Sequence, residues 1–327
     1  MSEAAAVSTI ARVSGFLYRA RKYLAYAADF AGQRLPRISF LNPRIEEVTI
    51  GGLLVRCERS LPSDPAVLSA WESLYLRTPS ATPFHSPVWQ QALLETAQAM
   101  HRLRFLTVYD KSRLVAVLPL ESHFGQVLRT SGAMLTDYLD PLIDPEYSQN
   151  GWPAILKGVS KLLPGRSVIL EHLREDVCCC ENLQLGAESA GFALSGSSNS
   201  SVARIALPNS WDAYLASLDS HERKELKRKM KKAEQQGGAK LVTCADPATM
   251  REELTKTFEL FEACGGGKGR KAKWLFPRHF DAVAPSLAAS GRLVLYKLMI
   301  EDRQAAAVIT LPSHKGQILW NTASIPP

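Results

Sequence analysis

The chain has 327 residues, more than a single domain usually contains, which favours two domains with separate cores. Its composition, 46% hydrophobic and 22% charged, is ordinary for a folded globular protein and excludes a disordered one. The net charge of +7 suits anionic partners, such as nucleic acid, a membrane surface or a phosphorylated cofactor. The six cysteines include no C-x-x-C pair, so we expect no metal site, and a reducing cytoplasm is the simplest setting.

The N-terminal segment differs in character from the rest of the chain. Residues 10–30 combine an apolar stripe with arginine and lysine and nearly lack acids, which is typical of a helix that lies on a membrane surface. A helix packed on the body of the protein and a frayed tail are the alternatives. We expect residues 1–44 to form this amphipathic helix and a linker, with a peripheral contact of residues 10–30 at the inner face of the membrane. No apolar run is long enough to span a bilayer.

The body begins with residues 46–58, whose β-forming residues predict a strand, and with residues 64–76, whose apolar spacing predicts a helix. Ser86 as cap and Pro87 at the first helical position predict a second helix.

The next part of the chain, residues 103–121, is rich in β-formers on both sides of a short turn and predicts a hairpin.

An acidic stretch with the sequence DYLDPLI follows at residues 137–143. It could place carboxylates and a phenol at the rim of a pocket, where Asp140 would act as a base or as a clamp for the acceptor. The alternative is a turn whose aspartates bond their own backbone. Beyond a predicted helix and strand, the serine-rich residues 195–201 mark a domain boundary, and residues 202–207 predict the first strand after it.

Residues 211–237 predict a long basic amphipathic helix, around which the second half of the chain is organised. Apolar residues recur every three or four positions, so one face can pack on a core while the lysines and arginines stay solvated. Arg223 and Lys227 share one helix face and are candidates for binding an anionic group of a substrate or cofactor. A simply solvated face is the alternative.

After that helix the sequence predicts two more helices, a connecting loop and three strands. Residues 264–273 contain CGGGKGR, which lacks the Gly and the Ser or Thr of a P-loop and predicts a basic loop, mobile or merely connecting. Residues 292–300, 304–311 and 317–324 read as successive antiparallel strands. Helices followed by an antiparallel meander indicate an α+β fold.

Five segments together resemble the CelD-like acyltransferases of the GNAT superfamily, which are related to the Fem-type aminoacyltransferases. They are FHSPVW (84–89), AVLPL (116–120), DYLDPLI (137–143), WDAYLASL with RKELKRK (211–229), and ILWNTASIPP (318–327). The resemblance implies two tandem GNAT-like domains, residues 45–200 and 201–327, with mixed or antiparallel sheets flanked by helices. It also implies transfer of an acyl group from acyl-CoA to an amine or hydroxyl of a small-molecule or saccharide acceptor, in polysaccharide or cell-envelope biosynthesis.

The same resemblance makes residues 317–324 the fourth strand of the second domain, beside which the family binds its cofactor. Since the sequence stops at Pro327, we expect that domain to be incomplete. Asn321, beside Trp320, would face the substrate there, although a core tryptophan with a polar neighbour is the alternative. A non-catalytic GNAT-like partner and a tRNA-dependent aminoacyltransferase remain rival functions. Nucleic-acid binding is disfavoured because the basic helix lacks interleaved aromatic residues.

Overall fold

The computed structural model describes residues 45–97, 102–123, 126–133, 135–177, 180–198, 201–235 and 238–325. The chain divides into two compact units, Met1–Asn42 and Pro43–Pro327, and the described residues belong to the second. The predicted membrane contact of residues 10–30 therefore lies outside them. None of the helices in these ranges is long and apolar enough to cross a membrane.

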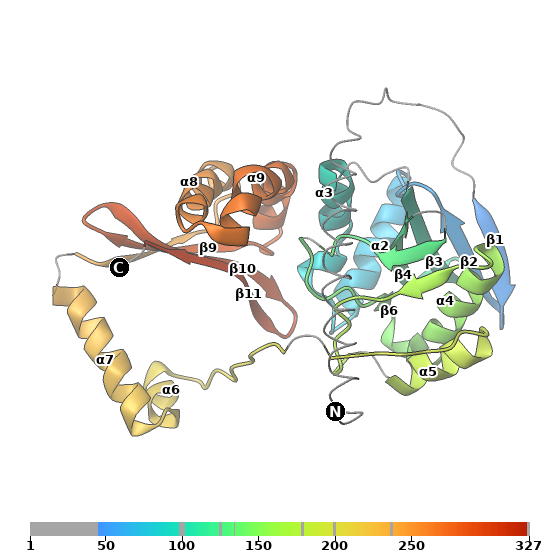
Figure 1. Cartoon of the computed structure of the whole chain (residues 1–327), viewed down its shortest axis with the longest axis horizontal. Helices are drawn as coiled ribbons and strands as arrows, with labels where there is room; N and C mark the ends of the chain where they lie inside the picture. The colour runs from blue at the N-terminus through green and yellow to red at the C-terminus, as the bar shows by residue number, and fades with distance from the viewer. Residues whose placement is uncertain are drawn as a thin grey trace, which may run out of the picture. The chain divides into compact units, whose positions relative to one another are not determined.

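The first half of the second unit contains a mixed sheet (Figure 1). Its strands lie in the order β1-β2-β3-β4-β5-β7, with β6 paired to β4; β5 and β7 pair in parallel and the other pairs are antiparallel. The strands are β1 (Glu46–Ile50), β2 (Leu53–Glu58), β3 (Leu103–Asp110), β4 (Arg113–His123), β5 (Val127–Thr130), β6 (Leu142–Ile143) and β7 (Ser167–Ile169).

Helices cover both faces of this sheet because β3 and β4 carry apolar residues on both sides, as central strands do. Phe105 packs with Trp71 of α2 on one face, and Leu106 packs with Ile155 of α4 on the other. The helices of this half are α2 (Pro65–Arg77), α3 (Pro87–Ala97), α4 (Ser148–Leu162) and α5 (Cys180–Ser189), with short 3-10 helices at Pro83–His85 and Pro145–Tyr147.

The second half contains an antiparallel sheet of four strands in the order β11-β10-β9-β8. Two helices, α8 and α9, cover one of its faces (Figure 1). In that layer Phe258 and Phe280 share a hydrophobic cluster with Leu295 and Ile309 of the sheet. The elements are α8 (Met250–Ala263), α9 (Gly266–Ala289), β8 (Lys240–Cys244), β9 (Val294–Ile300), β10 (Arg303–Ser313) and β11 (Gly316–Ser324). The predicted α+β architecture and its two sheets are confirmed.

The prediction of one strand over residues 46–58 is wrong. Gly51 and Gly52 have φ of 58° and 87°, in the left-handed region that glycine enters without a steric penalty. They turn the chain back, so that Val48 pairs with Val55 in a two-residue hairpin.

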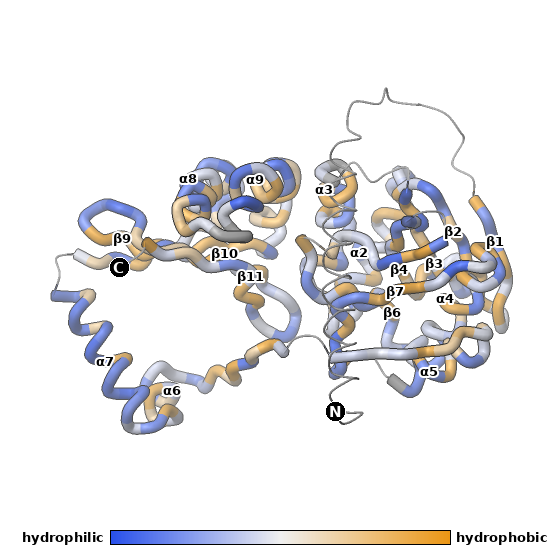
Figure 2. Tube along the Cα trace, viewed as in Figure 1, coloured by the Kyte–Doolittle hydropathy of each residue, from blue (hydrophilic) through white to orange (hydrophobic). Residues whose placement is uncertain are grey.

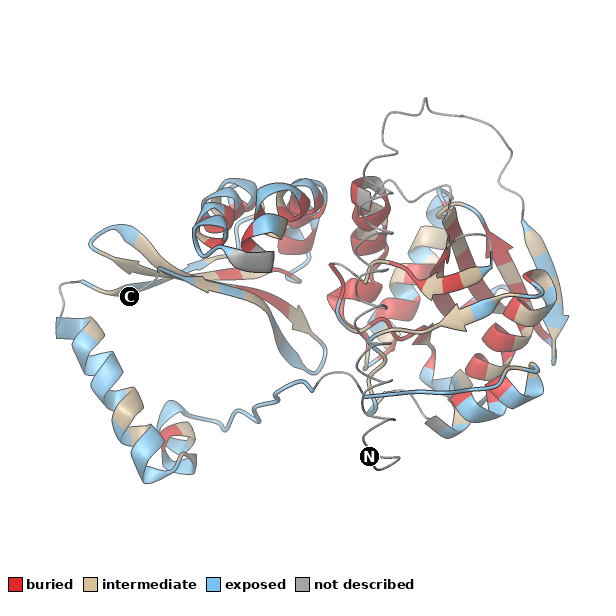
Figure 3. Ribbon diagram, viewed as in Figure 1, coloured by how far each residue is buried: buried red, intermediate tan, exposed pale blue. Residues whose placement is uncertain are grey.

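The prediction of one continuous helix over residues 211–237 is also wrong. The structure has two helices, α6 (Trp211–Ser217) and α7 (Ser220–Gln235), separated at Leu218 and Asp219. The carboxylate of Asp219 accepts hydrogen bonds from the backbone N–H groups of His221 and Glu222, both at 2.8 Å, and so begins a new helix. No residue of α7 is buried, whereas the sequence pattern predicted a face packed on a core. Figures 2 and 3 show a mostly hydrophilic, exposed helix.

Two further expectations fail. The predicted loop at residues 264–273 is helical from Gly266 onward, because the apolar residues that follow, Ala272, Leu275 and Phe276, are buried in the core beside α8 and favour helix over a free loop. Residues 202–207 form no strand: Ile205 and Leu207 are 66% and 78% exposed, and no described strand pairs with this segment.

Candidate functional site

The strand β11 contains a β-bulge at its centre. Asn321 lies opposite Ile309 of β10, but Leu319 lies opposite the next residue, Thr310, so Trp320 is an extra residue in the ladder. A bulge leaves its extra residue unpaired and changes the direction of the side chains around it, which is why bulges are frequent near active sites. Here it directs the indole of Trp320 toward the face that α8 and α9 cover.

The indole of Trp320 contacts three other parts of the chain, which are α9, α3 and the loop after β5. Its ring lies 5.1 Å from that of Phe276 and 5.0 Å from that of Phe280, both on α9, and 6.4 Å from that of Trp89 on α3. Its Nε1–H donates a hydrogen bond of 3.2 Å to the carbonyl of Leu135. The bulge of β11, the helix α9 and the loop after β5 therefore meet at one aromatic cluster.

The loop after β5 brings two polar side chains to this meeting point. Tyr138 has a left-handed backbone, with φ of 56°, a conformation that costs free energy and is often found at functional sites. Its ring lies under the guanidinium of Arg174, 5.0 Å away. Asp137 is exposed, yet the protein packed around its carboxylate partly desolvates it and raises its pKa, while His172 and Lys271 of α9 act in the opposite direction.

Asn321, one of the predicted site residues, lies beside this cluster. It follows Trp320 directly and is half-buried. Its side-chain amide, which can both donate and accept, makes no hydrogen bond within the described part of the chain.

Asp140, another predicted site residue, lines a small cavity and forms an ion pair. It is 5% exposed, and its two oxygens accept hydrogen bonds of 2.6 Å from the backbone N–H and the Nε of Arg174. Arg174 also donates to the carbonyl of Ser80. The carboxylate thus fixes the loop to the segment after β7 through a buried ion pair, which is a positioning role.

His85 connects a second loop to the same region. The backbone N–H of Thr82 donates to its Nδ1 at 3.0 Å, so that nitrogen carries no proton and Nε2–H donates to the carbonyl of Asp140 at 3.1 Å. Burial lowers the pKa of His85 to about 4. The imidazole is therefore neutral near pH 7 and acts as a hydrogen-bonding bridge between the two loops.

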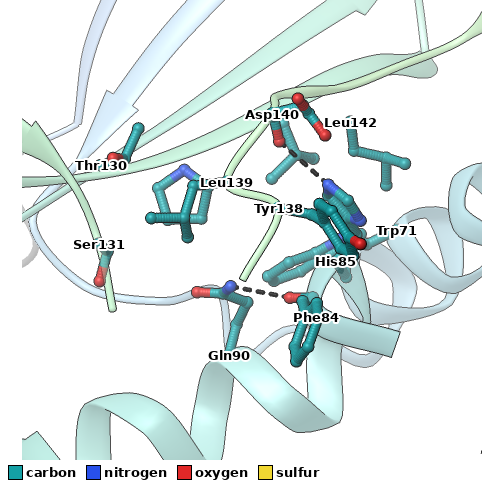
Figure 4. Close-up of a pocket in the computed structure, with 12 residues that line it drawn as sticks. Trp71, Phe84, His85, Gln90, Thr130, Ser131, Tyr138, Leu139, Asp140 and Leu142 are labelled. Atoms are coloured by element: carbon teal, nitrogen blue, oxygen red, sulfur yellow. Dashed lines mark hydrogen bonds between the residues drawn. The ribbon is translucent and has the colours of Figure 1, made fainter. Parts of the chain in front are cut away.

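A small cavity lies between these loops and the first sheet (Figure 4). Its volume is about 20 Å³, which is enough for one water molecule and far too small for an acyl chain. The side-chain N–H of Gln90 donates to the carbonyl of Phe84, whereas Gln90 Oε1 is buried without a partner in the described residues and faces this space. The cavity suits a structural water and does not itself hold a substrate.

The two predicted anion-binding residues lie on α7. Arg223 donates hydrogen bonds to the carbonyls of Ala216 and Leu218, at 3.1 and 2.7 Å, and so closes the connection between α6 and α7. Lys227 is exposed and has no ion pair within the described residues. No described contact joins either residue to β11 or to the loop after β5.

Metal ligands do not gather anywhere in the described ranges: no group of three or more His, Cys, Asp or Glu side chains is placed to hold an ion.

Sequence reasoning found part of this site and missed the rest. The adjacent Trp320 and Asn321, and the acidic stretch around Tyr138, were visible as motifs. The partner of Asp140 was not, because Arg174 is 34 residues away in the sequence and no local pattern connects them. The bulge was equally hidden, since it depends on the register between two strands.

The comparisons with known proteins bear on the second half of the chain. Residues 220–326 match the family model described as an acetyltransferase (GNAT) domain. No curated protein matches the chain. The matched range begins with α7 and ends with β11, so it includes the bulge and Asn321. The C-terminal part of the chain therefore carries a GNAT acetyltransferase domain.

Proposed function

We propose that the protein transfers an acyl group from acyl-CoA to an amine or hydroxyl acceptor at the bulge of β11. One observation carries the proposal: the GNAT match covers the strand in which Asn321, with an uncommitted amide, follows a bulged tryptophan. Acyl transfer by direct attack needs a hydrogen-bond donor for the thioester oxygen and a group that accepts the proton of the acceptor. Asn321 of β11 offers a donor, and Asp137 in the loop after β5 offers a proton acceptor.

The roles follow from the contacts of each side chain. Asn321 is suited to donate to an oxygen of the acyl donor or of the acceptor. Asp137 is exposed beside the aromatic cluster, and its raised pKa makes its carboxylate a better proton acceptor than an ordinary aspartate. Asp140 positions the loop through Arg174 and does not itself meet the reacting atoms. In this assignment Asp137 takes the role that the sequence suggested for Asp140.

The two predicted cofactor-binding residues on α7 have different surroundings. Arg223 is engaged by backbone carbonyls and supports the connection between the helices. Lys227 presents a free ammonium group and is the better candidate for a phosphate of acyl-CoA.

The finer assignment rests on the sequence resemblance. By likeness to the CelD-like acyltransferases, we propose that residues 45–200 and 201–327 are tandem GNAT-like domains. We further propose that the acceptor is a small molecule or saccharide of cell-envelope or polysaccharide biosynthesis. The site of action is then the cytoplasm, with a peripheral contact at the inner membrane face.

Calorimetric titration of the purified chain with acetyl-CoA and with a longer acyl-CoA tests the proposal. We expect saturable binding that Asn321→Ala and Lys227→Ala weaken at least about threefold each, because each removes a hydrogen bond or charge contact to the ligand. Lys224→Ala, on the same helix, is the matched control and leaves the affinity unchanged. Absence of binding to a chain that melts cooperatively would overturn the assignment and favour a non-catalytic partner protein.

A further inference from the structure

The helix α7 has an apolar stripe that nothing covers in the described structure. Leu226, Met230 and Ala233 lie on one side of the helix at spacings of three and four residues, while the lysines lie around them. None of its 16 residues is buried. An isolated helix of this length is only marginally stable in water and normally depends on packing of such a face. We therefore expect the apolar stripe of α7 to pack against another surface.

A matching apolar surface exists on the four-stranded sheet, on the face opposite α8 and α9. The register places Leu241 beside Leu298, and Tyr296 beside Val308, on this face. Leu241 and Leu319 are 72% and 67% exposed. None of these residues joins a hydrophobic core cluster of the described chain. We call this surface, formed by Leu241, Tyr296, Leu298, Val308 and Leu319, the open face.

Only a short stretch of chain separates the end of α7 at Gln235 from the start of β8 at Lys240. Four residues, 236–239, link α7 to β8 and span up to about 13 Å when extended. This reach exceeds the separation of about 10 Å between packed layers of secondary structure. Gly238 has φ of 83°, a left-handed conformation that favours a sharp reversal. A tether of this length holds the helix near the sheet at an effective concentration on the order of millimolar, well above that of any free partner.

Charges agree with one orientation of the helix on the sheet. Lys240 pairs in register with Met299, so the connection reaches the sheet beside the turn between β9 and β10. Glu301 and Asp302 of that turn are exposed, without an ion pair in the described structure. The last turn of α7 carries Lys231 and Lys232, which would face these two acids if the helix ran back along β8.

We propose that α7 packs Leu226 and Met230 on the open face of its own sheet. Both α7 and the sheet lie within the range that matches the GNAT domain, residues 220–326. In the packed state both faces of the sheet are covered, α8 and α9 on one side and α7 on the other. The proposal does not depend on acyl transfer.

Hydrogen exchange of the full chain, followed by mass spectrometry, tests the packing. We expect amides of α7 to exchange about 100-fold more slowly than in the free peptide of residues 220–235, because they open only when the helix leaves the sheet. Leu241→Asp, on β8, and Met230→Asp, on the helix, each return α7 to the rate of the peptide. Leu76→Asp, an exposed leucine on α2, is the matched control and changes nothing in α7. The amides of α8 stay protected in every variant, which shows that the domain remains folded.

Three results would overturn the proposal. The first is exchange in α7 as fast as in the peptide, or insensitive to Leu241→Asp. The second is protection that rises with protein concentration, which would make a second copy the partner. The third is protection that appears only with vesicles of phosphatidylcholine and phosphatidylserine, which would make an anionic membrane the partner.

Discussion

Two histidines of this protein are buried in their neutral form. His85 bridges two loops through both ring nitrogens. His279 of α9 lies fully buried with its ring 4.5 Å from that of Trp89, and the nearby carbonyl of Ala92 is not aligned for a hydrogen bond. Burial lowers the pKa of His85 to about 4 and that of His279 to about 3. In the folded chain both rings therefore stay neutral until the pH falls to about these values.

Acidification should therefore destabilise the fold. Above pH 6.5 both histidines are neutral in the folded and unfolded states; as the pH falls below 6.5, only the unfolded chain gains protons, until about pH 4 for His85 and about pH 3 for His279. Between pH 7 and 5.5 we expect the free energy of unfolding to fall by about 2.5 kcal/mol, measured by urea titration. His279→Phe should halve that loss. An unchanged pH dependence in this variant would show that His279 is accessible to protons when folded.

At the scale of elements, the sequence predicted what depends on local pattern. The two hairpins at residues 103–121 and 304–324 alternate β-formers around short turns, and the structure confirms both. The division of residues 211–237 was missed, although the apolar period stops at Leu218 and resumes only at Leu226, because the capping role of Asp219 was not considered. The start of α9 was missed because burial of Phe276 and its neighbours overrides the loop preference of glycine.

In the candidate site, too, the sequence predicted only what depends on neighbouring residues. Trp320 and Asn321 were found as neighbours in sequence, but the contact between Trp320 and Leu135 joins residues 185 positions apart. The ion pair of Asp140 could not be predicted because its partner Arg174 belongs to another segment, 34 residues away.

The loop after β5 depends on that ion pair. Asp140→Asn leaves the guanidinium of Arg174 buried without a counter-charge, and we expect it to lower the free energy of unfolding by about 3 kcal/mol. Asp137→Asn, three residues away on the exposed side of the loop, should change stability by less than about 0.5 kcal/mol. Chemical denaturation of both variants makes the comparison. Equal effects would mean that the pair with Arg174 does not hold the loop.

At the scale of the whole second unit, one hydrophobic cluster contains residues of both halves. Phe84, Trp89 and Leu93 from the first half share it with Phe276 and Phe280 of α9. Elements whose cores are continuous unfold together, even where each half has a sheet of its own. The halves are therefore expected to behave as one cooperative body.

Differential scanning calorimetry should accordingly show a single transition for the chain. Trp89→Ala, which opens the shared cluster, should separate it into two transitions at different temperatures. Trp71→Ala removes an equally buried indole from the cluster between α2 and the first sheet, and should lower the melting temperature while keeping a single transition. A single transition in both variants would show that the halves remain coupled without Trp89.

The bulge at Trp320 has a consequence for association between molecules. Within the described residues, β11 pairs on one side only, with β10, and so ends the sheet. Such an edge offers free N–H and C=O groups to a strand from another molecule, the first step toward fibrillar aggregates. The extra residue breaks the regular spacing of those groups in the middle of the strand, so that an incoming chain cannot pair along its whole length. The distortion that shapes the candidate site thus also protects the exposed edge.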